Sequence, residues 1–313
     1  MVTAASNRNV DILQLLVSAK ACLEFVIQNQ ETPLYVAAEF DHTEAVQLLL
    51  AAKANYDVWE DTEGRTPLTI AVERGYTNTV RVLVDAKARL NDRNFEDNAP
   101  IFIAIENGHI EVLKLLVASK ADIASEHFDF LSQDDETPLL FAVQHGAIDA
   151  VNVLLDAKVD VDATVEADFG RCTSTALCLA AAEGQTALVR RLLDAKADIN
   201  KQHPVRNAVM CGYETAQPTI LKLLITAKAD INKVYDRDGT TPAFMAAKKI
   251  KESVLSILVE AKADMNVAAH NGQTPAALVA AAAKTADARR VKAEKLMEKR
   301  KMRRGRQKKM PWV

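Results

Sequence analysis

The chain has 313 residues, of which 49% are hydrophobic and 5% aromatic, and its formal net charge is −3. No hydrophobic run reaches the roughly 18 residues expected of a membrane-spanning helix, and the first residues, MVTAA, lack the basic start of a signal peptide. The four cysteines form no CxxC pair. We therefore expect reduced thiols in an intracellular protein of the cytoplasm or the nucleus.

The small net charge conceals an asymmetry along the chain. Residues 284–313 contain 13 Lys and Arg residues against 3 Asp and Glu residues, a net charge of +10, which leaves −13 for residues 1–283. This difference predicts two parts: a repeat region over residues 1–283 and a basic, helical C-terminal extension over residues 284–313.

A short stretch ending in Lys and usually Ala recurs along residues 1–283. Its lysines are Lys20, Lys53, Lys87, Lys120, Lys158, Lys196, Lys228 and Lys262, which follow one another at steps of 33, 34, 33, 38, 38, 32 and 34 residues. A period in this range is typical of repeat architectures, in which each unit buries its apolar face against its neighbours.

Each repeat begins with a helix-start signal, because Thr can cap the first turn and Pro suits the first helical position. A short helix such as 34–39 follows, then a turn, then a second helix whose apolar residues recur at i, i+3 and i+4, as in Val46, Leu49 and Leu50. The starts are Thr32-Pro33, Thr66-Pro67, Thr137-Pro138, Thr241-Pro242 and Thr274-Pro275, with weakened copies at Ala99-Pro100, Thr175-Ala176 and His203-Pro204. The turn glycines are Gly75, Gly108, Gly146, Gly184 and Gly212, where we expect left-handed backbone.

Polar stretches such as residues 55–65 separate the repeats and are expected to form extended fingers. Two of them, residues 122–136 and 160–174, are longer than the others. The first repeat has no Thr-Pro start, so we expect it to be incomplete.

These motifs together resemble the ankyrin repeat. The resemblance rests on Thr-Pro-Leu, on Ala37-Ala38, on Gly108-His109, on Val-x-x-Leu-Leu and on the run Ala-Asp-Ile-Asn at 197–200, and it covers about residues 1–283. It implies an all-α solenoid of about eight to nine helix-turn-helix repeats with short β-hairpin fingers on one side. Ankyrin repeats usually have Gly where this chain has the recurring Lys. A left-handed Lys costs roughly 1 kcal/mol, which its position at a helix C-terminus partly offsets by about 0.3–1 kcal/mol.

The sequence contains no pattern that is typical of a catalytic or metal site. It lacks a phosphate-binding glycine loop, a nucleophile elbow and an HExxH motif, so we expect no enzyme activity, cofactor or metal. His42 and His109 occupy the turn, where we expect hydrogen bonds to neighbouring backbone. Acidic pairs such as Glu60-Asp61 are expected to be solvated loop residues, and Cys178 a small core residue.

Two groups of residues are candidates for partner binding. Aromatic residues in the fingers can anchor a partner, although each can instead cover its own loop. The aromatic candidates are Tyr56, Trp59, Phe95, Phe128, Phe130 and Tyr235. The basic candidates of the tail are Lys299, Arg300, Lys301, Arg303, Arg304, Arg306, Lys308 and Lys309.

The favoured function is a monomeric protein–protein interaction scaffold or adaptor that binds a partner through the concave helix face and the fingers. One alternative is a nuclear regulatory protein whose basic tail binds nucleic acid or another acidic partner, or serves as an import signal. The tail can also fold onto the acidic fingers or have no partner. Another alternative is a non-catalytic fragment of a larger enzyme.

Overall fold

The computed structural model describes residues 1–26, 30–60, 62–124, 127–129, 134–164, 174–235 and 238–284; for 127–129, 134 and 135 it describes the backbone alone. The chain forms two units, Met1–Gln202 and His203–Val313.

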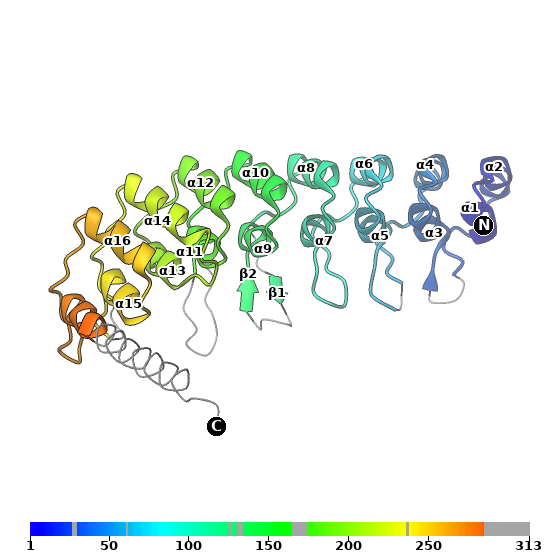
Figure 1. The fold of residues 1–313 in the computed structure, drawn as a ribbon. Coiled ribbons are helices and arrows are strands. Elements are labelled where there is room, and N and C mark those ends of the chain that lie inside the picture. Colours follow the sequence, from blue (N-terminus) through cyan, green and yellow to red (C-terminus); the bar gives the residue numbers. More distant parts are fainter. Residues whose placement is uncertain are drawn as a thin grey trace, which may run out of the picture. The chain divides into compact units, whose positions relative to one another are not determined.

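The N-terminal unit is a stack of six helix pairs (Figure 1). The first helix of each pair packs against the first helices of the neighbouring pairs, and the second helices pack likewise, so the unit has two rows of helices. We refer to these rows as inner and outer helices. The pairs are α1 (Val2–Ser6) with α2 (Val10–Ser18), α3 (Pro33–Glu39) with α4 (Thr43–Ala51), α5 (Pro67–Glu73) with α6 (Thr77–Asp85), α7 (Pro100–Glu106) with α8 (Ile110–Ala118), α9 (Pro138–Gln144) with α10 (Ile148–Asp156), and α11 (Ala176–Ala182) with α12 (Thr186–Asp194).

The C-terminal unit continues the same pattern with two further pairs. Residues 275–284 are also helical and follow Thr274, whose hydroxyl accepts a hydrogen bond from the Ala277 N–H at 3.2 Å. The described residues thus contain eight helix pairs and the start of another helix, as the repeat period predicts. The pairs are α13 (Pro204–Met210) with α14 (Gln217–Thr226) and α15 (Pro242–Lys248) with α16 (Glu252–Glu260).

The inner helices start where the Thr-Pro motifs predict. The Thr66 hydroxyl accepts the N–H of Thr69, whose own hydroxyl accepts the Thr66 N–H in return, and Pro67 occupies the first helical position. Thr175 caps its helix equally well although Ala follows it. Thr32, Thr137 and Thr241 cap α3, α9 and α15 in the same way. The inner helices are short and almost fully buried, and Phe102 and Leu68 are among their core residues.

The turn between the two helices of a pair is tied to the preceding repeat. His42 Nδ1 lies 2.6 Å from the Ala5 carbonyl oxygen, and His109 Nε2 lies 2.9 Å from that of Glu73. Gln185 donates to the Val143 carbonyl at 2.9 Å in the corresponding place. The prediction that the turn histidines bond neighbouring backbone is confirmed.

The left-handed positions largely follow the sequence. All eight recurring lysines have positive φ, between 54° and 71°, and all eight are exposed. Gly75, Gly108, Gly146 and Gly184 are left-handed as well. Gly212 is not, because the preceding C-cap residue of α13, Cys211, has an extended conformation at φ −46° and ψ 135°. The prediction for Gly212 was therefore wrong.

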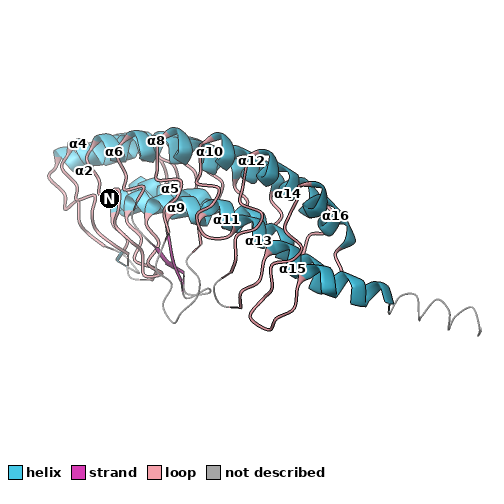
Figure 2. Ribbon diagram, turned by 90° about the vertical axis from the view of Figure 1, so that its left-hand side faces the viewer, coloured by secondary structure: helices cyan, strands magenta, loops and turns pink. Residues whose placement is uncertain are grey.

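The fingers project from one side of the helix rows (Figure 2). Among the described residues, strands occur in a single finger, where β1 (His127–Asp129) pairs with β2 (Asp134–Glu136) in antiparallel register, and one isolated bridge joins Tyr235 and Thr240. The second and third fingers, residues 55–65 and 89–98, are irregular loops rather than the β-hairpins that the resemblance implies. Side chains take up their backbone N–H groups instead: Asn94 Oδ1, for example, accepts those of Glu96 and Asn98 at 3.1 and 2.8 Å.

Candidate functional site

Hydrogen bonds couple the bases of most neighbouring fingers. Two residues after most of the recurring lysines, an Asn or Asp closes a local turn, as Asn55 Oδ1 does by accepting the Asp57 N–H at 3.0 Å. Four residues after the Lys, a side-chain oxygen accepts an N–H from the following finger. In the N-terminal unit these inter-finger bonds are Glu24 with Asn55 at 2.9 Å, Asp57 with Arg89 at 3.5 Å, Asn91 with Asp122 at 2.9 Å and Asp162 with Asp198 at 2.9 Å. In the C-terminal unit Asn232 bonds Asp264 at 2.8 Å.

This series is interrupted at one position of the N-terminal unit. Ala124 stands four residues after Lys120, where the other fingers carry an acceptor, and its methyl group cannot accept the N–H of Asp160. The N–H of Asp198, one finger further along, again has its partner in Asp162. The finger that contains Ala124 (residues 122–136) is thus joined less firmly at its base to the next finger (residues 160–174) than the others are to theirs.

Glu60 holds the second finger in its shape. Its side chain is 2% exposed, and its carboxylate accepts the backbone N–H groups of Thr62 and Glu63, each at 2.7 Å, and of Arg65 at 3.3 Å, besides the Thr62 hydroxyl. Burial alone raises the pKa of Glu60, but these hydrogen bonds outweigh it and lower the pKa to about 2. The expectation that Glu60 is a solvated loop acid was wrong.

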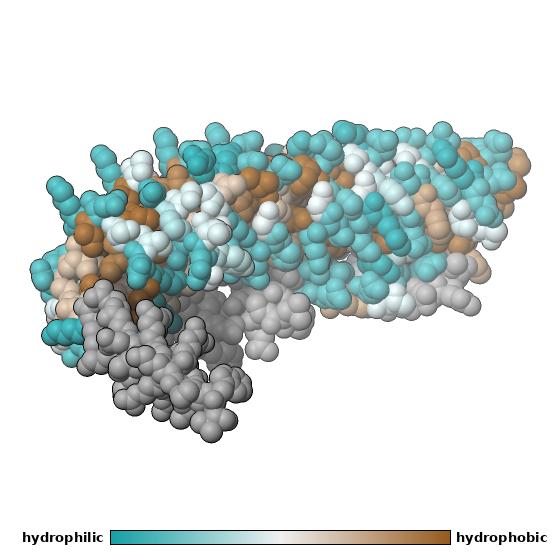
Figure 3. All heavy atoms as spheres, in the orientation of Figure 1, coloured by the Kyte–Doolittle hydropathy of each residue, from teal (hydrophilic) through white to brown (hydrophobic). Residues whose placement is uncertain are grey.

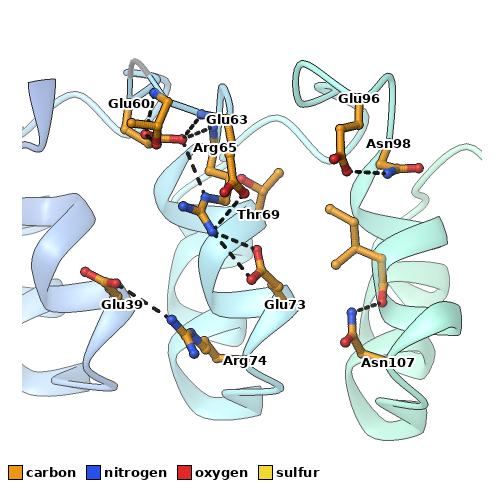
Figure 4. Close-up of polar contacts among 12 residues, drawn as sticks. Glu39, Glu60, Glu63, Arg65, Thr69, Glu73, Arg74, Glu96, Asn98 and Asn107 are labelled. Atoms are coloured by element: carbon orange, nitrogen blue, oxygen red, sulfur yellow. Dashed lines mark hydrogen bonds and ion pairs between the residues drawn. The ribbon is translucent and has the colours of Figure 1, made fainter. Parts of the chain in front are cut away.

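Arg65 joins this finger to the inner helix α5. Figure 4 shows Glu60, Glu63 and Glu73 converging on its guanidinium group. Its Nε lies 3.5 Å from Glu60 Oε1, and its Nη1 lies 3.2 Å from Glu63 Oε2 and 3.3 Å from Glu73 Oε2. Since the Arg65 side chain is only 17% exposed, the finger is fixed at a defined angle to the helix row.

An exposed aromatic pair lies across the second and third fingers. The rings of Trp59 and Phe95 meet edge to face, with centroids 6.4 Å apart at 74°. Trp59 is 44% exposed and Phe95 58%. The Phe95 N–H donates to the Glu63 carbonyl at 2.9 Å, and the Phe95 ring lies over Gly64, where a Cβ atom would come within 2.4 Å of Phe95 Cδ1. The structure thus brings together two of the predicted aromatic candidates.

The C-terminal unit has the same backbone arrangement with different side chains. The His270 N–H donates to the Asp238 carbonyl at 3.1 Å, and its ring lies over Gly239. His270 and Phe95 both stand eight residues after a recurring Lys, and Val234 stands in the place of Trp59, six residues after one. The fold therefore accepts other side chains at both positions.

Asp92 lies beside this aromatic pair in the third finger. Burial raises its pKa, and the rise is partly opposed by Arg89, with Nη1 3.8 Å from Asp92 Oδ2, and by a hydrogen bond with the Trp59 side chain. The buried Oδ2 atom has no hydrogen-bond partner among the described residues. Arg89 itself also contacts Asp57 at 3.2 Å, so its charge is shared between two acids.

The net negative charge of residues 1–283 is concentrated in the fingers of the N-terminal unit. The first four fingers (residues 22–31, 55–65, 89–98 and 122–136) contain 15 Asp and Glu residues and 3 arginines, a net charge of −12. Residues 1–283 as a whole carry −13. Hydrophobic patches between hydrophilic side chains are visible on the face drawn in Figure 3.

The other candidates lie apart from the Trp59–Phe95 pair or outside the described residues. Tyr56 is partly buried. Tyr235 packs within the C-terminal unit, with the Arg206 guanidinium 4.2 Å from its ring centroid and the His203 ring at 5.1 Å. Phe128 falls in β1, whose backbone alone is described, and Phe130 and all eight basic candidates of the tail lie outside the described residues.

The described residues contain neither a metal site nor a membrane-spanning helix. No three His, Cys, Asp or Glu side chains in this part of the chain are placed to hold a metal ion, and no helix described there is long and apolar enough to cross a membrane. Cys178 is buried in the core, as expected.

Comparison with known proteins identifies the repeats. A family model described as ankyrin repeats in three copies matches residues 1–94, 55–127, 92–165 and 124–203. These matches overlap and together span residues 1–203 of 313, about two thirds of the chain. No curated protein matches the chain.

Proposed function

Because the chain belongs to the ankyrin repeat family, whose repeats are generally protein–protein interaction modules, we propose that it is a non-catalytic scaffold or adaptor that binds a protein partner through its fingers and the adjoining inner helices. The observation that supports this function best is the Trp59–Phe95 pair, two large rings that stay 44% and 58% exposed on loops whose shape is fixed. Aromatic side chains of this kind often dominate the energy of protein interfaces.

Rigidity of the fingers favours binding there. The Glu60 and Arg65 contacts, together with the hydrogen bond from Phe95 to Glu63, fix both loops in the free protein. A partner then meets rings that are already in place, and less conformational entropy is lost on association.

The test is capture of partners from a lysate of the source cells on the immobilised full chain, quantified by mass spectrometry. The variant is Trp59→Ser with Phe95→Ser, and the matched control is Ile148→Ser, which removes a 40% exposed apolar side chain from the outer helix α10. We expect proteins held by the unaltered chain and by the control to fall at least about tenfold with the double variant. Equal capture by all three, with unchanged circular dichroism, would refute the proposal.

The charge of residues 284–313 supports a second proposal, that the tail contacts nucleic acid or another acidic partner. Its net charge is +10, and binding through phosphates should weaken steeply with salt. We expect a variant of the full chain, with the eight basic residues of 299–309 replaced by Gln, to lose all binding to labelled oligonucleotides. Retained binding by that variant would contradict this second proposal.

A further inference from the structure

We propose that the second and third fingers bind a basic segment of the partner protein, with a Lys or Arg side chain of that segment held against the Trp59–Phe95 pair. This inference rests on the proposed function and adds the chemistry of the partner to it.

The first argument is the charge around the aromatic pair. Glu63 precedes Gly64, on which the Phe95 ring lies, and Glu96 follows Phe95, so two carboxylates flank the pair in sequence. Glu63 is 57% exposed on its side chain although it contacts Arg65, and Glu96 is exposed although it accepts a hydrogen bond from Asn98 at 3.4 Å. The two fingers together have seven acidic residues and three arginines.

The second argument is that the arginines of these fingers are already engaged. Arg65 contacts three glutamates, Arg89 bridges Asp57 and Asp92, and Arg93 pairs with Asp97. These pairs cancel much of the positive charge locally, so the acids that remain set the sign of the field that a partner meets. An acidic peptide or a nucleic acid would be repelled from the same surface.

The third argument is the geometry of the rings. In an edge-to-face pair each ring leaves at least one face uncovered by the other, and both rings here are about half exposed. A cation over such a face is attracted by the ring quadrupole, most strongly over Trp. Exposed aromatic faces beside exposed carboxylates therefore favour Lys or Arg over a purely apolar side chain.

The experiment uses Trp59 as its own reporter. The chain has two tryptophans, Trp59 and Trp312, so the full chain with Trp312→Phe emits from Trp59 alone. The probe is a 12-residue peptide of alternating Arg and Ala, about the length of one finger, and its counterpart replaces Arg with Glu. Both are titrated at pH 8 in 50 and 300 mM NaCl, concentrations that span about 14 to 6 Å of screening length. We expect saturable change of Trp59 emission with the Arg peptide alone, and weaker binding at the higher salt.

Three variants separate charge, ring and fold. Glu63→Gln with Glu96→Gln should weaken the Arg peptide at least about twofold. Phe95→His should weaken it about two- to fivefold while keeping the backbone arrangement, since His270 occupies the corresponding place in the C-terminal unit. The control Glu111→Gln removes an exposed acid from the outer helix α8 and should change nothing.

The chain's own basic tail is a competing occupant, and a further variant tests it. In this variant the basic residues of 299–309 become Gln. If the Arg peptide binds this variant but not the chain with its own tail, the Trp59–Phe95 surface accepts basic peptides as inferred, and the tail occupies that surface in the unaltered chain.

The inference would be overturned if the Arg peptide changed Trp59 emission neither in the chain with its basic tail nor in the chain with the Gln-substituted tail. It would also be overturned if Glu63→Gln with Glu96→Gln left the binding of the Arg peptide unchanged. The proposed function fails separately: if Trp59→Ser with Phe95→Ser leaves lysate capture intact, the fingers are not the contact surface, whatever the peptide does. If that capture is lost but the Arg peptide does not bind, the fingers hold a partner that is not basic.

Discussion

Replacing the buried Glu60 by Gln should destabilise the N-terminal unit in a manner that depends on pH. The hydrogen bonds to the Glu60 carboxylate lower its pKa from 4.5 to about 2. Each pKa unit corresponds to about 1.4 kcal/mol, so the charged form contributes about 3 kcal/mol to the free energy of unfolding. The side chain is 2% exposed, and solvent screening therefore reduces this figure little.

The sign follows from the direction of the shift. Because the pKa of Glu60 is lower in the folded state than in the unfolded state, its contribution is complete above pH 4.5 and is lost as the pH falls towards 2. Gln cannot supply two acceptor oxygens to the N–H groups of Thr62, Glu63 and Arg65. We expect Glu60→Gln to be less stable by about 3 kcal/mol at pH 7 and by much less at pH 2.5.

Urea unfolding followed by circular dichroism at pH 7, 4.5 and 2.5 measures this difference. Other carboxylates titrate equally in both proteins, so the difference between them isolates Glu60. Glu63→Gln is the matched control, because that side chain is 57% exposed and its loss should cost less than about 1 kcal/mol. A gap between the unaltered chain and Glu60→Gln that stays constant with pH, or a gap no larger than that of the control, would refute the reasoning.

Two smaller changes test the backbone features. Ala124→Asn supplies the missing acceptor for the Asp160 N–H and should raise the free energy of unfolding by about 0.5–1.5 kcal/mol. The control Ala124→Leu has a side chain of nearly the same shape as Asn but no acceptor, so it should bring no such gain. Equal stability of the two variants would contradict the role of the inter-finger hydrogen bonds. Lys87→Gly relieves a left-handed residue at φ 71° and should gain up to about 1 kcal/mol, because a strain of about 1–2 kcal/mol exceeds the entropic cost of Gly. Lys87→Ala keeps the backbone strain, so a Gly variant that is no more stable than the Ala variant would contradict the strain assigned to the left-handed Lys87.

The parts of the fold that depend on local sequence were predictable. A Thr before Pro caps a first turn wherever it occurs, and the repeat period places a left-handed residue at each recurring Lys. His42 and His109 bond the preceding repeat because their position in the turn brings each of them to a carbonyl in the last turn of the preceding inner helix. In each of these cases the determining contacts recur with the repeat.

What the sequence did not reveal depends on contacts that occur once. In the sequence Glu60 is one of many loop acids, and its burial follows from the particular turn 60–65, including Arg65, which joins this turn to Glu73 of α5. Trp59 and Phe95 lie 36 residues apart in the sequence, and they meet because Phe95 lies over a Gly of the neighbouring finger. The signal available in advance was the spacing of Asp and Asn after most of the recurring lysines, which aligns one finger with the next.

Two of the rings that lie over a Gly, those of Phe95 and His270, belong to fingers, and comparing them separates what the fold requires from what it leaves open. In both, an N–H bonds the carbonyl before the Gly, at 2.9 Å for Phe95 and 3.1 Å for His270. The backbone arrangement therefore does not depend on which of the two rings is present. Since the fold accepts His270 and Val234 in one unit, it does not account for Phe95 and Trp59 in the other. Apart from the hydrogen bond between the Trp59 and Asp92 side chains, the two half-exposed rings gain the folded chain little by themselves, and the proposed basic partner would supply the interaction that accounts for them.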